Sequence, residues 1–129
     1  MQGRIMAIDD EPDILKIVEL SLSRWGYSID TFTDPVQALD SFRKSPQQYS
    51  LILTDVNMPG MSGSELVIRA RNARPDIKVM VMTAFDVDRD LKKALPALEG
   101  DGFLQKPFSV ADVCVAVRRH MTEASTQGG

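Results

Sequence analysis

The sequence predicts a single domain of the α/β class, in which a parallel sheet is covered by helices on both faces. Three observations support this class. Short apolar runs alternate with longer segments of helical periodicity, as parallel strands alternate with crossover helices. Two of the runs are continuously apolar, as expected of inner strands in a parallel sheet. The 129 residues, of which 43% are hydrophobic, are enough to build one packed core.

The strands are expected where the short apolar runs occur. Leu51–Leu53 and Val79–Met82 are the two continuously apolar runs, so the third and fourth strands should lie inside the sheet. The second strand alternates polar and apolar residues and should be less buried, as at an edge. In all, five strand–helix pairs follow one another, with strands at residues 4–8, 28–33, 49–54, 78–82 and 102–104.

The first three helices are bounded by capping and helix-breaking residues. The first helix is expected to begin at Pro12, whose fixed φ suits a first turn, and to stop at Gly26. The second follows the N-cap residue Asp34. The third is expected at about residues 64–74, because Pro75 prevents its continuation.

Two further helices are expected in the last third of the chain. One lies at about residues 87–95, and the other begins with Ser109 as its N-cap and Asp112 three residues later. The residues that follow this last helix are small and polar. We therefore assign residues 1–122 to the domain and residues 123–129 to a flexible tail or the stub of a linker.

Composition narrows the possible functions. Eighteen acidic and fifteen basic residues give a formal charge of -3, so we do not expect direct binding to nucleic acid. The apolar runs are too short to span a membrane, and the N-terminus leads into a strand rather than a signal sequence, so a cytoplasmic protein is expected. The single cysteine, Cys114, excludes an internal disulfide and should fill the core.

Polar residues follow four of the five expected strands. Open parallel sheets bind their ligands outside the carboxyl ends of the strands, so these residues should meet at one edge. Each alone has an ordinary structural explanation, since an acid after a strand often caps the next helix and a lone threonine or lysine is usually at the surface. Their convergence favours a functional site. They are Asp9 and Asp10, Asp55, Thr83 and Lys106.

Three carboxylates at one edge of a sheet require a cation. Two carboxylates about 4 Å apart repel by roughly 4 kcal/mol at an effective dielectric constant near 20. Mg²⁺ suits such a site because it prefers oxygen ligands and is commonly shared between carboxylates and a phosphate. Softer metals prefer histidine or cysteine, and neither lies near the strand ends.

A metal, a carboxylate nucleophile, an ammonium group and a hydroxyl together supply what phosphoryl transfer needs. Asp55 is the candidate nucleophile because it ends the most apolar strand, while Asp9 and Asp10 can hold the metal. Lys106 would act as a point charge on a phosphoryl oxygen. Thr83 would donate a hydrogen bond to another, worth roughly 1.5 to 3 kcal/mol for a charged partner.

Four ordered motifs now identify a family. The chain resembles the receiver domains of two-component response regulators, of the chemotaxis-regulator type, over residues 3–121. Any one motif alone would be weak, but together at these strand ends they are specific. They are Asp9–Asp10–Glu11–Pro12, the segment from Asp55 to Gly63, Thr83–Ala84 and Lys106–Pro107–Phe108.

The resemblance implies a fold and a metal site. The fold would be flavodoxin-like, with a doubly wound five-stranded parallel sheet of strand order 2-1-3-4-5 and five helices. Asp55 would be the phosphoacceptor, taking its phosphoryl group from a histidine kinase. Asp10 would bind Mg²⁺ directly and Asp9 largely through water. The backbone carbonyl of Asn57 would complete the protein's share of the metal ligands.

The resemblance also implies a switch and its partners. Thr83 and Phe103 would form the switch pair, Lys106 would contact the phosphoryl group, and the Lys106–Pro107 peptide bond would be cis. Phosphorylation would change the face made by the fourth helix, fifth strand and fifth helix. A sensor histidine kinase or phosphotransfer protein would act upstream, and an effector protein or an output domain downstream. The domain would dephosphorylate itself and would not be a conventional enzyme.

Other functions fit the sequence less well. A pseudo-receiver that serves only protein contacts stays open, although it would have no reason to keep the repulsive carboxylates. A flavodoxin-like electron carrier needs a loop rich in serine, threonine and glycine after the first strand, which this chain lacks. A phosphatase of the haloacid dehalogenase type needs a second carboxylate two residues after the nucleophile, where this chain has Asn57.

One segment departs from the usual family pattern. Residues 95–102 differ from it, and the spacing from Thr83 to Lys106 is longer than usual.

Overall fold

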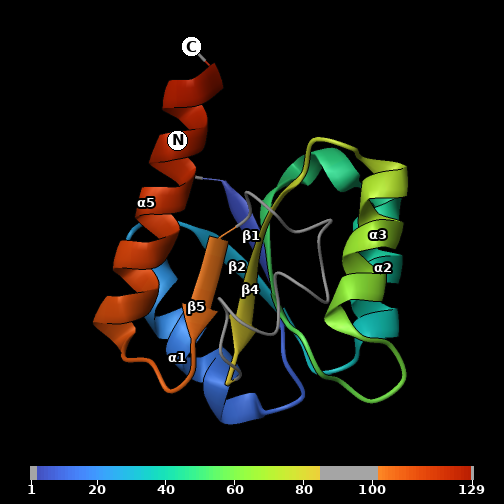
Figure 1. The fold of residues 1–129 in the computed structure, drawn as a ribbon, viewed down its shortest axis with the longest axis horizontal. Helices are drawn as coiled ribbons and strands as arrows, with labels where there is room; N and C mark the ends of the chain where they lie inside the picture. The colour runs from blue at the N-terminus through green and yellow to red at the C-terminus, as the bar shows by residue number, and fades with distance from the viewer. Residues whose placement is uncertain (1–2, 85–101, 129) are drawn as a thin grey trace.

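The computed structural model describes residues 3–84 and 102–128. Within these ranges one sheet runs through the molecule, with its strands in the order β2-β1-β3-β4-β5 (Figure 1). Every neighbouring pair is parallel. The predicted strand order is therefore confirmed. The strands are β1 (Arg4–Ile8), β2 (Ser28–Phe32), β3 (Tyr49–Asp55), β4 (Lys78–Thr83) and β5 (Gly102–Gln105).

Helices cover both faces of the sheet, as the doubly wound class requires. Helices α1 (Pro12–Ser23) and α5 (Val110–Gly128) lie together on one face, and α2 (Pro35–Lys44) and α3 (Gly63–Ala73) lie on the other. A short 3-10 helix, η1 (Pro46–Gln48), leads into β3. The helix expected at about residues 87–95 lies outside the described residues, as does most of the segment 95–102.

Two apolar cores fill the space between the sheet and its helices. In β3, Ile52 packs toward α2 and α3, whereas Leu51 and Leu53 pack toward α1 and α5. All three are fully buried, as predicted for an inner strand. Cys114 of α5 is also buried. By contrast, β2 has no fully buried residue and forms an edge of the sheet, which confirms the expectation from its alternating sequence.

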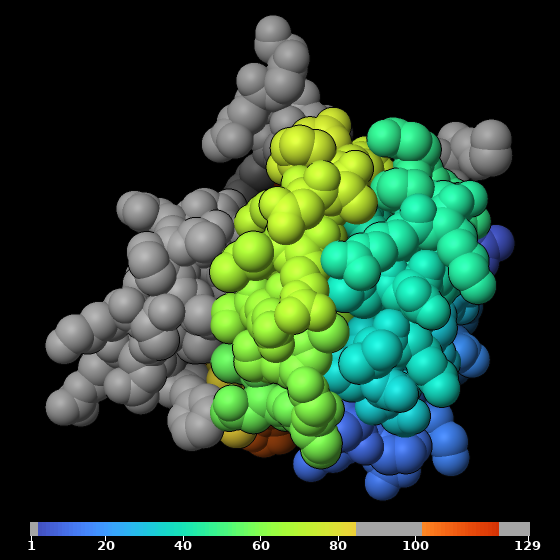
Figure 2. All heavy atoms as spheres, turned by 90° about the vertical axis from the view of Figure 1, so that its right-hand side faces the viewer, coloured from blue at the N-terminus to red at the C-terminus, as the bar shows by residue number. Residues whose placement is uncertain are grey.

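Helices α2 and α3 together cover one face of the sheet. Figure 2 shows α3 lying alongside α2, with side chains of both packed against each other along their length. Their large exposed apolar residues, Val36 and Ile68, are 53% and 54% exposed. Each belongs to a different helix, and scattered apolar residues of this kind are normal on a protein surface. The described part of this face thus serves mainly to cover the core.

The helix caps predicted from the sequence are present. The Asp34 side chain accepts a hydrogen bond from the Val36 N–H at 2.9 Å. At the start of α5, Ser109 Oγ accepts from the Asp112 N–H at 3.1 Å, and the Asp112 carboxylate accepts from the Ser109 N–H at 2.9 Å. This reciprocal pair satisfies two backbone donors that the helix itself cannot use.

Helix α5 is longer than expected. It continues to Gly128, through most of the segment 123–129 that we expected to be a flexible tail. No glycine or proline occurs between Val110 and Gln127, so nothing in the sequence stops the helix earlier. The division into a domain of residues 1–122 and a tail remains a prediction. Within the described ranges, no helix is both long and apolar enough to cross a membrane.

Candidate functional site

Three carboxylates meet at the carboxyl edge of the sheet. Asp55 is the last residue of β3, and Asp9 directly follows the neighbouring strand β1. Asp10 comes next in the chain. One carboxylate oxygen from each of the three lies within 4.8 Å of the others. The structure thus brings together the three acids that the sequence placed at this edge.

Asp9 is the most deeply buried of the three acids. Its side chain is fully inaccessible to solvent, and its backbone N–H donates to the carbonyl of Phe32 in β2 at 3.1 Å. One carboxylate oxygen accepts from the Glu11 N–H at 2.9 Å. The other lies 2.7 Å from the ammonium nitrogen of Lys106. Both oxygens of Asp9 are therefore engaged by this protein's own groups.

Asp55 is less buried than Asp9 but more buried than Asp10. The residue is 8% exposed, and its Oδ1 accepts a hydrogen bond from the Val56 N–H at 2.8 Å. Its Oδ2 lies 3.6 Å from Lys106 Nζ. Asp10, in contrast, is exposed. Asp10 thus forms the solvent-exposed side of the cluster.

Burial dominates the electrostatics of the site. It raises the pKa of Asp9 above its usual value, and Lys106 and the Glu11 N–H only partly offset this. Burial also raises the pKa of Asp55, and the negative charge of Asp9 raises it further. For Lys106, burial acts to lower the pKa, but the hydrogen bond and charge of Asp9 and the charges of Asp55 and Glu11 outweigh it and raise the pKa. One ammonium group thus leaves negative charge uncompensated.

The donor set suits a hard divalent cation. The cluster of Asp9, Asp10 and Asp55 offers carboxylate oxygens only, which are the ligands that Mg²⁺ prefers. A dication among these carboxylates would stabilise their ionised forms, and so would oppose the rise in the pKa of Asp9 and Asp55. The residues present therefore fit Mg²⁺ in both chemistry and charge.

The remaining predicted residues lie on β4, β5 and the loop after β3. Thr83, the last residue of β4, is buried, and its carbonyl accepts from the Lys106 N–H at 2.7 Å. The Lys106–Pro107 peptide bond is cis. Phe103 lies on β5 in register with Val81 and packs partly buried against the core under α2 and α3. Asn57 is exposed in the loop that joins β3 to α3.

Two residues near the cluster were given no role by sequence reasoning. Glu11 holds Asp9 through its N–H, and its carboxylate lies 3.7 Å from Lys106 Nζ. The sequence feature that could have identified Glu11 is its position directly after Asp9 and Asp10. Gly63 packs against the backbone of Asp55. Its position at the end of the motif from Asp55 to Gly63 was a signal, but the contact itself depends on where α3 meets β3.

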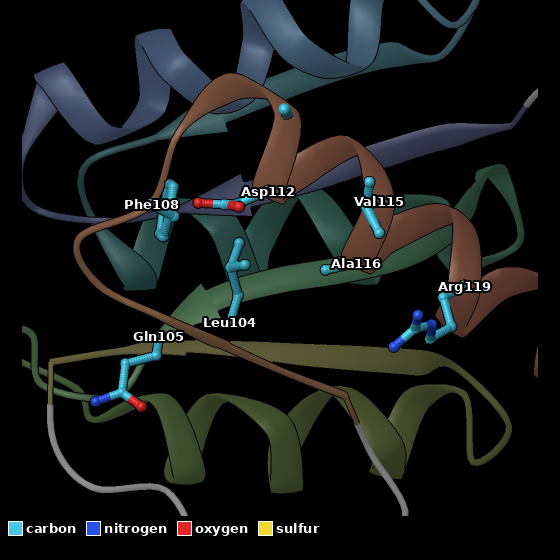
Figure 3. A pocket seen from close by; sticks show the side chains of 8 residues that line it. Leu104, Gln105, Phe108, Asp112, Val115, Ala116 and Arg119 are labelled. Atoms are coloured by element: carbon cyan, nitrogen blue, oxygen red, sulfur yellow. The ribbon is translucent and has the colours of Figure 1, made fainter.

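A separate pocket lies between β5 and α5. Figure 3 shows the side chains that line it, with Phe108 toward one end, Arg119 toward the other and Leu104 between them. Its volume is about 400 Å³, and none of the acidic cluster contributes to it. The lining residues are Leu104, Gln105, Phe108, Ala111, Asp112, Val115, Ala116 and Arg119.

The fold and the cluster together define a class of protein. A parallel sheet of order 2-1-3-4-5, with acids and a lysine at the carboxyl ends of its strands, is the arrangement of a receiver domain. The chain belongs to this family: a sequence model of the response regulator receiver domain matches residues 5–118. It is thus the receiver domain of a two-component response regulator.

Individual relatives agree with this assignment. The chain is 30% identical over 130 residues to the response regulator receiver protein CpdR of Brucella abortus, covering 94% of this chain and 98% of that protein. It is 32% identical over 114 residues to the probable transcriptional regulatory protein TcrX of Mycobacterium tuberculosis, covering 88% of this chain but 47% of TcrX. The chain thus spans about half the length of some relatives and nearly all of others. Among solved structures, chemotaxis protein CheY4 of Vibrio cholerae superimposes with a TM-score of 0.82, at 27% identity over 92% of this chain and 98% of that one.

Proposed function

We propose that this domain is a phosphorylation-dependent switch that accepts a phosphoryl group on Asp55. One observation carries the proposal: carboxylate oxygens of Asp9, Asp10 and Asp55 lie within 4.8 Å of one another, with Lys106 Nζ 2.7 Å from Asp9 and 3.6 Å from Asp55. Mg²⁺ would be held by the carboxylates of Asp10 and Asp55, by the backbone carbonyl of Asn57 and, largely through water, by Asp9. When bound, it would neutralise charge on the acid cluster and on the incoming phosphoryl group.

Asp55 would be the nucleophile. The Val56 N–H fixes its Oδ1, and β3 holds its backbone rigidly in the sheet. The N–P bond of a phosphohistidine on the donor would break as an O–P bond to the Asp55 carboxylate forms. Lys106 is close enough to Asp55 to stabilise the phosphoryl oxygens as a point charge.

The phosphorylated state would be read out through β4, β5 and α5. Thr83 would donate its hydroxyl proton to a phosphoryl oxygen, and Phe103 of β5 would move inward with it. A smaller pocket, lined by Phe103 together with Ala116 and Arg119 of α5, joins this ring to the surface made by β5 and α5, which supports a role for that surface in binding an effector protein. Water would later hydrolyse the acyl phosphate, so the domain would act on its own side chain rather than turn over a substrate.

The partners follow from this chemistry. A sensor histidine kinase or a phosphotransfer protein would supply the phosphoryl group in the cytoplasm. The chain spans less than half of TcrX, a probable transcriptional regulatory protein, whereas it matches CpdR over almost its whole length. The downstream partner would accordingly be either a separate effector protein or an output domain. We do not propose that this domain contacts nucleic acid directly.

The proposal is tested with a small phosphodonor. Incubation of the protein with Mg²⁺ and acetyl phosphate should add one phosphoryl group, detected by intact-mass spectrometry. Asp55→Asn should abolish the addition, whereas Asp40→Asn, at an exposed carboxylate on α2, should not affect it. Failure of the wild-type protein to gain mass, with both Mg²⁺ and donor present, would indicate a pseudo-receiver that acts by protein contacts alone.

A further inference from the structure

Gly63 lies where helix α3 meets the end of strand β3. It is the first residue of α3, directly after the N-cap Ser62, whose hydroxyl accepts from the Glu65 N–H at 3.2 Å. The Gly63 N–H donates to the carbonyl of Val56 at 2.8 Å. The start of α3 is therefore hydrogen-bonded to Val56, the residue that follows Asp55.

A side chain at position 63 would collide with this backbone. A Cβ atom on Gly63 would lie 2.2 Å from the carbonyl oxygen of Asp55 and 3.0 Å from Cα of Val56, and contacts of Cβ atoms under 3.0 Å are essentially never found. The atoms that it would meet belong to the backbone, so they cannot rotate aside as a flexible side chain could. A methyl group here would have to displace either the Asp55–Val56 peptide or the start of α3.

The peptide that Gly63 contacts also orients the carboxylate of Asp55. The carbonyl oxygen of Asp55 and the N–H of Val56 belong to one peptide unit, which is planar and rigid. That N–H donates to Asp55 Oδ1 at 2.8 Å. A push on the carbonyl oxygen would therefore tilt the whole unit and carry the N–H away from the carboxylate that it holds.

We propose that Gly63 is a positioning residue for Asp55. Because it has no side chain, α3 can pack directly on the Asp55–Val56 peptide and so fix the N–H that directs the Asp55 carboxylate toward Mg²⁺ and the phosphoryl donor. The role of the orientation in phosphorylation rests on the function proposed above. The effect of Gly63 on the position of the Asp55–Val56 peptide can be measured without metal or phosphodonor.

Two other glycine-to-alanine variants serve as matched controls. Gly60 lies in the same loop with φ +88, but a Cβ there would meet nothing within 4 Å, so Gly60→Ala adds backbone strain without a collision. At Gly102, outside the cluster, a Cβ would lie 2.8 Å from the side chain of Met80. Gly102→Ala therefore disturbs packing in the core without touching the peptide that holds Asp55.

The experiment compares Gly63→Ala with both controls in three measurements. These are the amide resonance of Val56 in the Mg²⁺-free protein, the Mg²⁺ dissociation constant by calorimetry, and the rate of phosphorylation by acetyl phosphate. For Gly63→Ala we expect a shifted Val56 resonance, and Mg²⁺ affinity and phosphorylation rate each reduced about tenfold, equal to about 1.4 kcal/mol. Gly102→Ala should keep the resonance in place and the Mg²⁺ affinity within about twofold of wild type, even where urea unfolding shows it to be less stable. Gly60→Ala, which lies in the loop of the proposed ligand Asn57, serves as a control for the Val56 resonance alone.

The proposal would be overturned if Gly63→Ala matched Gly102→Ala in its Val56 resonance, its Mg²⁺ affinity and its rate of phosphorylation. Should Gly63→Ala not fold, the measurements are repeated in trimethylamine N-oxide, which favours the compact state. A chain still unfolded there would show that Gly63 serves the fold alone, and the positioning role would be rejected. If the wild type bound no Mg²⁺ and took up no phosphoryl group, the proposed function would fail, whereas the Val56 resonance would still decide the positional claim.

Discussion

Lys106 pairs more closely with Asp9 than with Asp55, the proposed phosphoacceptor. Its ammonium nitrogen lies 2.7 Å from Asp9 Oδ2 and 3.6 Å from Asp55 Oδ2. Asp9 is the acid that is wholly buried, and an ionised carboxylate without a partner is most unfavourable in such a place. In the metal-free protein, Lys106 therefore stabilises the fold through its ion pair with Asp9.

Replacing Lys106 should destabilise the metal-free protein. In Lys106→Met the buried Asp9 carboxylate loses its ion-pair partner, which should lower the free energy of unfolding by on the order of 3 kcal/mol. Saturating Mg²⁺ should recover part of this loss, because the ion supplies the missing positive charge. Urea unfolding with and without Mg²⁺ measures both effects, with Lys16→Met, at an exposed position on α1, as the control. Equal stability of Lys106→Met and Lys16→Met would contradict the expected role of the ion pair.

The acid cluster should make the metal-free protein less stable as its acids ionise. The pKa of Asp55 in the folded protein is raised above 3.8, mainly by burial, so the folded state binds this proton more tightly than the unfolded state does. The resulting loss of stability is full above the folded pKa and vanishes below 3.8. Metal-free Asp55→Asn should thus be more stable than wild type at neutral pH, and the difference should shrink as the pH falls toward that value. Urea unfolding across this pH range measures the difference in unfolding free energy between the two proteins. A variant less stable than wild type at neutral pH would refute the prediction.

Much of the fold could be predicted because its strands are encoded locally. The apolar runs of β3 and β4 and the alternation of β2 fixed which strands are inner and which lie at an edge. The capping pair Ser109 and Asp112 likewise marked the start of α5. The end of α5 was not predicted, because polar residues are compatible with a helix or a tail, and only the absence of glycine and proline before Gly128 indicates that the helix can continue.

The candidate site could be predicted as a set of residues but not as a geometry. Strand ends in a parallel sheet bring Asp9 and Asp55 to one edge, whatever the details of packing. Which acid Lys106 pairs with depends on a side chain from a distant segment, and on burial that only the folded protein defines. The contact of Gly63 with Asp55 depends in the same way on how closely α3 approaches β3.

Mg²⁺ binding should depend on the exposed acid of the cluster. Asp10→Asn removes one charge and weakens one ligand, so we expect the Mg²⁺ dissociation constant to rise about tenfold, or about 1.4 kcal/mol. Asp13→Asn is the matched control, because Asp13 is also exposed, lies in the first turn of α1 and is not a member of the cluster. Calorimetric titration should show near-wild-type affinity for this control. A loss of affinity equal in both variants would point to general charge effects rather than to ligation by Asp10.

Thr83 should affect phosphorylation without affecting metal affinity. Its hydroxyl is proposed to donate to a phosphoryl oxygen, a charged acceptor, so Thr83→Ala should lose roughly 1.5 to 3 kcal/mol of stabilisation, or about 10- to 150-fold in the rate of phosphorylation. Thr83→Ser keeps the hydroxyl and should restore most of the rate. Because Thr83 is buried, both variants should also be compared by urea unfolding, so that lost packing is separated from the lost hydrogen bond. Intact-mass time courses with acetyl phosphate measure the rates. If serine and alanine slowed the reaction equally, the methyl group rather than the hydroxyl would be responsible, and the proposed contact with the phosphoryl group would be wrong.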